Sequence, residues 1–158
     1  MAVLHKFLQA EPKKKIILLQ VFTVQIFVRI ALLTLPFYII LGMLQRIQLR
    51  TTSNPKILSP DTDKQCVDNH PDIQHLPWAV RATSSFVPGS RCLCQAITAQ
   101  TILAWKGYSS ELHIGVQKNE SSNLAAHAWL VKNEMVIVGN LPNLVDFIPL
   151  PALPKVIR

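Results

Sequence analysis

The sequence contains little cysteine, which limits the kinds of fold and site that it can form. Its 158 residues include three cysteines, Cys66, Cys92 and Cys94. An odd number in a chain without clear secretory features argues against a disulfide framework and favours a reducing compartment such as the cytoplasm. Cys92 and Cys94 have a single residue between them, a shorter spacer than paired zinc ligands use. We therefore expect no metal site and no other cofactor.

Aromatic and acidic residues are also scarce. Aromatic residues make up 7% of the chain, and 16 Lys and Arg against 9 Asp and Glu give a net charge of +7. Basic chains can bind nucleic acid, but here the basic residues do not form one stripe interleaved with aromatic side chains. The charge predicts a preference for acidic partners or anionic membrane surfaces, and no nucleic-acid partner.

A long segment near the N-terminus lacks charge almost completely. Arg29 is the only charged residue from Ile16 to Leu44. Pro36 has no backbone donor, so we expect it to divide this segment into an apolar helix of about twenty residues and a shorter helix reaching about Arg50. The first helix is long enough to cross a membrane, and no small-residue cleavage site of a signal peptide follows it.

The apolar segment also lacks the polar stripe of a soluble amphipathic helix. Only Gln25 and Arg29 share a face at i,i+4 spacing. Residues 16–44 are therefore expected to be buried in lipid, in a partner or against the rest of the chain. Basic residues flank both ends and leave an orientation across a membrane undecided.

The composition changes twice along the chain. Residues 51–76 are rich in Thr, Ser, Asn, Pro and Asp, as is typical of a linker. Beyond them, the patterns predict helices at 78–82 and 91–105, followed by three strands at 112–116, 125–131 and 135–138. Helices followed by antiparallel strands predict an α+β domain. The expected parts are an apolar helical segment at 1–50, the linker at 51–76, a core domain at 77–150 and a tail at 151–158.

Cys92 lies at the first turn of the helix expected at 91–105, directly after Pro88-Gly89-Ser90. Unpaired backbone N–H groups and the positive end of the helix dipole favour a thiolate there. The same N–H groups can hold an oxyanion once the sulfur attacks a carbonyl. Cys94 lies about 200° further round the helix and should face the core. Most cysteines are small buried hydrophobes, so a catalytic cysteine also needs a base.

His127 is the candidate base, with a buried core histidine as the alternative interpretation. It lies in the strand expected at 125–131, between alanines that leave its ring accessible. A two-residue turn at Asn133 and Glu134 would set the register of the hairpin that follows. Counting outward pairs Lys132 with Met135, Val131 with Val136, Trp129 with Val138, and His127 with Asn140.

The predicted pairing supplies a third member of the site. Opposed residues share a face, so the Asn140 amide oxygen could accept a hydrogen bond from Nδ1–H of His127 and fix its tautomer. A shift of one residue would place Gly139 opposite instead. Asp146 is the alternative orienting residue, and His113 is expected to be structural.

Several motifs occur in order along the second half: Trp78-Ala79-Val80, Pro88-Gly89-Ser90-Arg91-Cys92-Leu93, Leu112-His113-Ile114-Gly115-Val116 and Ala126-His127-Ala128-Trp129. Over Trp78 to about Leu150 the chain resembles the lasso-peptide leader peptidases of the transglutaminase-like superfamily. The resemblance implies a small papain-like core with Cys92 as nucleophile and His127 as general base. Family members usually have an aspartate where this sequence has Gly139-Asn140, although papain-like enzymes use asparagine in that role.

The resemblance also implies a substrate and partners. Such a peptidase removes the leader from a ribosomally made precursor, together with a separate leader-recognition protein and a macrolactam cyclase. The apolar helices before the core are similar to those of the same proteins. Two other functions stay open: an inactive scaffold that binds the precursor or the cyclase, and a transamidating acyltransferase in which an amine replaces water.

Overall fold

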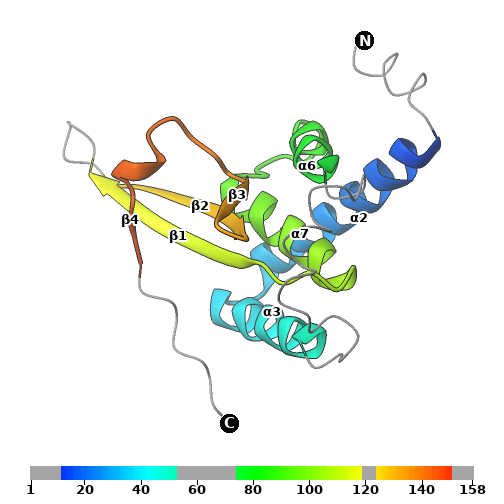
Figure 1. Ribbon diagram of the computed structural model, residues 1–158, viewed down its shortest axis with the longest axis horizontal. Helices are drawn as coiled ribbons and strands as arrows, with labels where there is room; N and C mark the ends of the chain where they lie inside the picture. The colour runs from blue at the N-terminus through cyan, green and yellow to red at the C-terminus, as the bar shows by residue number, and fades with distance from the viewer. Residues whose placement is uncertain (1–11, 53–73, 119–123, 151–158) are drawn as a thin grey trace.

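The computed structural model describes residues 12–52, 74–118 and 124–150 (Figure 1). This part of the chain forms four α-helices and one four-stranded antiparallel sheet. The prediction of an α+β fold with apolar N-terminal helices is confirmed. The expected tail at 151–158 and most of the expected linker lie outside the described residues, and the predicted division into parts at 50 and 76 stays a prediction.

The helices follow the breaks that proline and glycine impose. They are α2 (Pro12–Thr34), α3 (Phe37–Thr52), α6 (Leu76–Ser84) and α7 (Cys92–Trp105). The break between α2 and α3 falls at Leu35 and Pro36, as predicted, because proline cannot donate within a helix. Gly107 follows α7 with a φ of +86°, the left-handed conformation that ends many helices.

The sheet has the strand order β3-β2-β1-β4. Its strands are β1 (Glu111–Lys118), β2 (Leu124–Lys132), β3 (Met135–Val138) and β4 (Ile148–Pro149), with a short 3₁₀ helix, η2 (Leu144–Asp146), before β4. The first three strands confirm the predicted strands. The sequence did not predict β4, because two exposed residues ending in a proline carry no alternating pattern.

The hairpin turn is as predicted, but the register beyond it is not. Asn133 and Glu134 have φ values of +47° and +65°, as a two-residue turn of this kind requires. The first two predicted pairs occur, and then a bulge shifts the ladder so that Val138 pairs with Leu130 instead of Trp129. The predicted pairing of His127 with Asn140 is therefore wrong, because the bulge adds one residue to β3.

Helix α7 lies at the centre of the fold, between the sheet and the other helices (Figure 1). One buried cluster joins α2 and α6 to α7 and to the inner face of the sheet. Its members include Val21, Val24, Ala79, Val80, Ala99, Leu103, Ala128, Leu130 and Val138. The N-terminal helix α2 therefore shares a core with the segment that carries Cys92 and His127.

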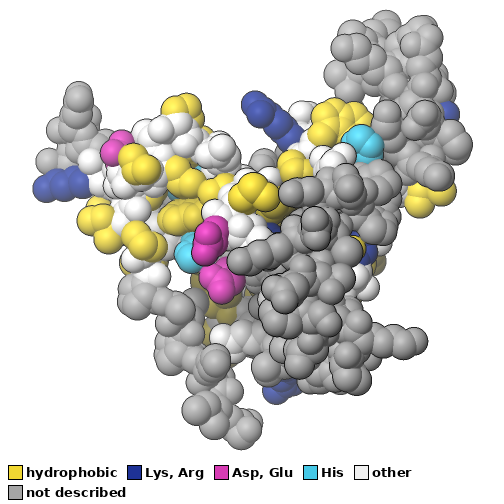
Figure 2. All heavy atoms as spheres, in the orientation of Figure 1, with side chains coloured by type: hydrophobic (Ala, Val, Ile, Leu, Met, Phe, Trp, Pro, Cys, Tyr) yellow, Lys and Arg dark blue, Asp and Glu magenta, His cyan; other side chains and the backbone are white. Residues whose placement is uncertain are grey.

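The outer face of α2 remains apolar and exposed. From Lys15 to Thr34 the helix is long and apolar enough to cross a membrane by length and composition alone. Its inner face holds the fully buried Val21 and Gln25, whereas Leu19 and Phe27 on the outer face are exposed. Figure 2 shows further hydrophobic side chains over the sheet, where Leu124, Val145 and Ile148 are exposed.

Candidate active site

Cys92 is the first residue of α7, as the sequence predicts. Arg91 precedes it in an extended conformation and makes no side-chain hydrogen bond to cap the helix. The first N–H groups of a helix have no partner within it, so those of the first turn of α7 point beyond its N-terminus. Cys92 is a free, half-buried cysteine packed against the central core cluster. Its placement suits a nucleophile supported by backbone N–H donors.

A tight loop leads into Cys92. The Ser90 N–H donates to the Val87 carbonyl at 3.1 Å, and the Arg91 N–H donates to the Gly89 carbonyl at 2.9 Å. Gly89 has a φ of +71°, a conformation that side chains disfavour. Gln95, one turn into α7, donates from Nε2 to the Ser90 carbonyl at 3.2 Å. The loop and the start of the helix are therefore tied together.

Cys94 faces the core, as predicted, and is 2% exposed. Its Sγ lies 3.8 Å from the Gln25 carbonyl oxygen on α2. Burial raises the pKa of this thiol, and hydrogen bonds with Ser90 and Thr98 and the charge of Arg29 offset the rise only in part. A buried thiol that stays protonated near neutral pH is a poor nucleophile, which separates Cys94 from Cys92.

The His127 ring is held by a backbone carbonyl. Its Nε2 lies 2.7 Å from the Gly139 carbonyl oxygen, which can only accept a hydrogen bond. Nε2 must therefore carry a proton, and in the neutral ring Nδ1 is then the basic nitrogen. Trp129 stacks on the ring with centroids 6.2 Å apart, and Phe147 tilts against it at 5.5 Å. These contacts fix both the tautomer and the orientation of the ring.

Within the described residues, the two side chains expected to orient His127 make no hydrogen bond with it. Asn140 is exposed, and no hydrogen bond joins it to His127 within the described residues. Asp146 is also exposed and accepts from Gln117 Nε2 at 3.5 Å. A catalytic part for Asn140 stays a prediction. In the sequence, Gly139 entered only as the residue that a one-residue shift would place opposite His127. Its carbonyl could not be predicted as the partner, because a main-chain acceptor has no side-chain signature.

Cys92 and His127 lie on neighbouring elements. α7 packs against β2 and β3, and Cys92 contacts the cluster that contains Ala128 and Val138. Ala128 belongs to the inner face of the sheet, so His127 is on the other face, and its Nε2 meets Gly139 directly after β3. Within the described part of the chain no hydrogen bond joins Cys92 to His127. Catalytic hydrogen bonds are often long in substrate-free sites and tighten when substrate binds.

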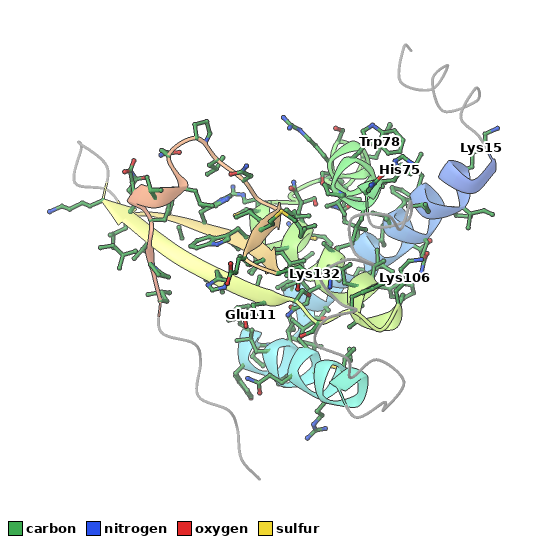
Figure 3. All side chains as sticks on the ribbon, in the orientation of Figure 1. Lys15, His75, Trp78, Lys106, Glu111 and Lys132 are labelled. Carbon is green, nitrogen blue, oxygen red and sulfur yellow. The ribbon has the colours of Figure 1, made fainter. Side chains whose placement is uncertain are left out.

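Two other histidines take no part in this arrangement. His113 stacks on Trp129 with centroids 5.7 Å apart and lies 3.5 Å from a Glu111 oxygen, which fits a structural residue. His75 precedes α6, on the side of the molecule away from the sheet (Figure 3). No group of three metal-binding side chains occurs among the residues that the structure describes.

Gly139 provides a test of the His127 contact. A Cβ at this position would lie 2.7 Å from the Ala128 carbonyl oxygen and 2.9 Å from Trp129 Cα, at a φ of +86°. We expect Gly139→Ala to destabilise the fold by about 1 to 3 kcal/mol and to displace the carbonyl that holds His127. Urea unfolding measures the loss of stability.

Gly42→Ala is the matched control for this substitution. A Cβ at Gly42, inside α3, would have no neighbour within 4 Å. Alanine also has the higher helix propensity, so the control should be as stable as the original chain or slightly more stable. A Gly139→Ala protein as stable as this control would contradict the tight approach of Gly139 to β2.

Comparison with known proteins identifies the family of this fold. The family model of the transglutaminase-like superfamily matches residues 31–152, a range that contains Cys92, His127 and the entire sheet. No curated protein and no solved structure matches the chain significantly.

Proposed function

The chain belongs to the transglutaminase-like superfamily, and we propose that it is a cysteine peptidase with Cys92 as nucleophile and His127 as base. The superfamily supports a peptidase or acyltransferase that works through a cysteine. The observation that carries the proposal is the half-buried Cys92 at the uncapped start of α7. Its core helix packs on the strand that carries His127.

In the proposed mechanism the reaction begins with proton transfer from the Cys92 thiol to Nδ1 of His127, which requires substrate binding to bring the two side chains together, since His127 lies on the sheet face opposite Ala128. The sulfur then attacks the peptide carbonyl carbon, and the N–H groups of the first turn of α7 stabilise the oxyanion. The C–N bond breaks as the imidazolium returns the proton to the leaving amine, which leaves a thioester. Water attacks the thioester with His127 again as base, and the acid product departs from the restored thiol. The Nε2–H bond to the Gly139 carbonyl keeps the ring oriented throughout.

We further propose that the substrate is the leader segment of a lasso-type precursor peptide. The motifs around Cys92 and His127 support this choice, because they resemble those of leader peptidases in both sequence and order. A separate leader-recognition protein would deliver the precursor, and a macrolactam cyclase would use the released core. Asn140, exposed just beyond Gly139, would contact the substrate or His127 in that complex.

The direct test incubates the full chain with a precursor peptide encoded beside its gene and with the encoded recognition protein. Mass spectrometry should detect a leader fragment that ends in a free carboxylate. A leader fragment joined to an added amine would instead show transamidation, since amine and water attack the same thioester. An intact precursor, together with a Cys92 that reacts with thiol reagents no faster than Cys66, would identify an inactive scaffold.

We also propose that the outer face of α2 and α3 lies on an anionic membrane surface. Leu19, Phe27 and Leu33 are each about two-thirds exposed on this side, at 66%, 67% and 67%. Basic residues flank the helices, and Arg46 is exposed. An apolar helix face with basic flanks is suited to the interface of anionic lipids. The packed inner face of α2 favours surface contact over a span.

Phe27→Asp tests the membrane contact. A charge at the centre of the outer face should weaken binding to vesicles of 30% phosphatidylglycerol by about tenfold or more, as measured by co-sedimentation. Val145→Asp, at an exposed apolar residue on the sheet side, should bind as the original chain does. Equal binding by the original chain and Phe27→Asp would contradict contact through α2.

A further inference from the structure

Gln25 is a fully buried polar residue on the inner face of α2. Its amide Nε2 donates to Ser84 Oγ at 2.8 Å and also to Ser90 Oγ, and its Oε1 accepts from Thr83 Oγ1 at 2.6 Å. Both amide protons and the amide oxygen are therefore used. A buried amide with all of these bonds formed holds its partners in one arrangement. Gln25 thus fixes Ser90, two residues before Cys92, relative to α6.

Arg29 makes a second connection one turn further along α2. Its Nε donates to the Pro88 carbonyl at 3.1 Å, and the guanidinium lies against Gly89, where a side chain would collide with it. Gln25 and Arg29 together contact Pro88, Gly89 and Ser90. These are the three residues that turn the chain into Arg91 and the start of α7.

We propose that Gln25 and Arg29 are positioning residues of the active site, and this inference rests on the proposed function. They hold the loop at 88–90 so that the first turn of α7 presents the Cys92 sulfur and its N–H groups in a fixed direction. A small displacement of a catalytic group lowers the rate strongly, since the reacting atoms must be aligned to within a fraction of an ångström. Neither residue needs to touch the substrate.

Gln25 and Arg29 are polar residues that α2 directs toward α6 and the loop at 88–90, and a positioning role gives both of them a purpose. A helix that only crossed a membrane would gain nothing from burying Gln25 against Thr83, Ser84 and Ser90. With this network formed, α2 is part of the domain that carries out the chemistry. The activity should therefore depend on α2 being docked, and not only on residues 77–150.

Alkylation of Cys92 by iodoacetamide tests the inference without a peptide substrate. Mass mapping of the Cys92 peptide gives its rate between pH 5 and 9. We expect Gln25→Leu and Ser90→Ala each to lower this rate near neutral pH, and kcat/KM for the precursor, by about 10 to 100-fold. KM should change little. The double variant should lose no more than either single variant, because both remove the same contact.

Two variants of α2 serve as controls. Thr23→Val removes an exposed hydroxyl that donates to the Leu19 carbonyl of its own helix, and this variant should behave as the original chain. Val21→Ala removes buried apolar contacts and should lower the melting temperature while the pH profile of Cys92 alkylation stays the same.

Arg29→Lys, which retains a donor for the Pro88 carbonyl, should keep more of the alkylation rate than Arg29→Ala.

An unchanged rate of Cys92 alkylation in Gln25→Leu would overturn the positioning role. Additive losses in the double variant would also overturn it, since Gln25 would then act by a route other than Ser90. A failed positioning role can be told apart from a failed peptidase mechanism. If Cys92→Ala still cleaved the precursor, the peptidase mechanism would fail, whereas the alkylation rates would still show whether α2 positions Cys92.

Discussion

A Cys92→Ala variant should cleave the precursor at least about a thousandfold more slowly than the original chain. The substitution removes the sulfur that forms the thioester in the proposed mechanism. The remaining N–H groups of α7 would still bind a carbonyl oxygen but would have no nucleophile beside them. Single-turnover cleavage, followed by mass spectrometry of the leader fragment, measures the loss.

The fold should tolerate this change. Cys92 is half-buried and alanine is a good helix former, so the stability should change by less than about 1.5 kcal/mol. Cys94→Ala is the matched control, because Cys94 lies in the same helical turn as Cys92 but faces the core. It should lose stability and retain most of its kcat. Cleavage by Cys92→Ala at the original rate would remove Cys92 from the mechanism.

A His127→Ala variant should lose about a thousandfold in kcat, because in the proposed mechanism His127 takes the proton from Cys92. The mutated site also loses the acid that protonates the leaving amine. Samples of the cleavage reaction, quenched at long time points and analysed by mass spectrometry, measure the residual activity. His113→Ala removes a neighbouring histidine that stacks on the same Trp129 and should keep its kcat within about threefold.

The two histidine variants separate chemistry from packing. Both lose a ring that contacts Trp129, so both should lower the melting temperature, and His127→Ala should lower it further because it also loses the bond to the Gly139 carbonyl. Only His127→Ala should affect the chemical step. Equal kcat values for the two variants would show that His127 is a structural residue of the sheet and that another group is the base.

Local sequence signals predicted the elements that carry the candidate site. Pro36 breaks the apolar segment into α2 and α3, and the loop at 88–90 precedes the helix that begins at Cys92. The turn at Asn133 and Glu134 sets the first pairs of the hairpin. These features depend on backbone sterics within a few residues, so a sequence pattern is sufficient to place them.

Features that depend on distant contacts could not be predicted in the same way. The bulge in the β2–β3 pairing shifts the register, and the partner of His127 is the Gly139 carbonyl instead of the predicted Asn140 side chain. Gln25 was visible as a polar residue in an apolar helix, but its partners Ser84 and Ser90 are 59 and 65 residues away. Sequence spacing carries no signal for such long-range contacts.

The N-terminal segment has two different surroundings in the structure. The sequence left residues 16–44 open to burial in lipid, in a partner or against the rest of the chain. In the structure one face of α2 packs on α6 and α7, and the other face is exposed and apolar. One helix can therefore support the active site and offer a surface to a membrane at the same time.

The central claim is that Cys92 is a reactive nucleophile supported by the start of α7 and by His127. The most direct measurement is the rate of iodoacetamide alkylation of Cys92, Cys94 and Cys66 in the same full-length sample near pH 7. Cys92 should react at least about tenfold faster than Cys66 and faster still than the buried Cys94, and His127→Ala should remove that advantage. A Cys92 that reacts no faster than Cys66 would contradict the account and identify the chain as an inactive member of its superfamily.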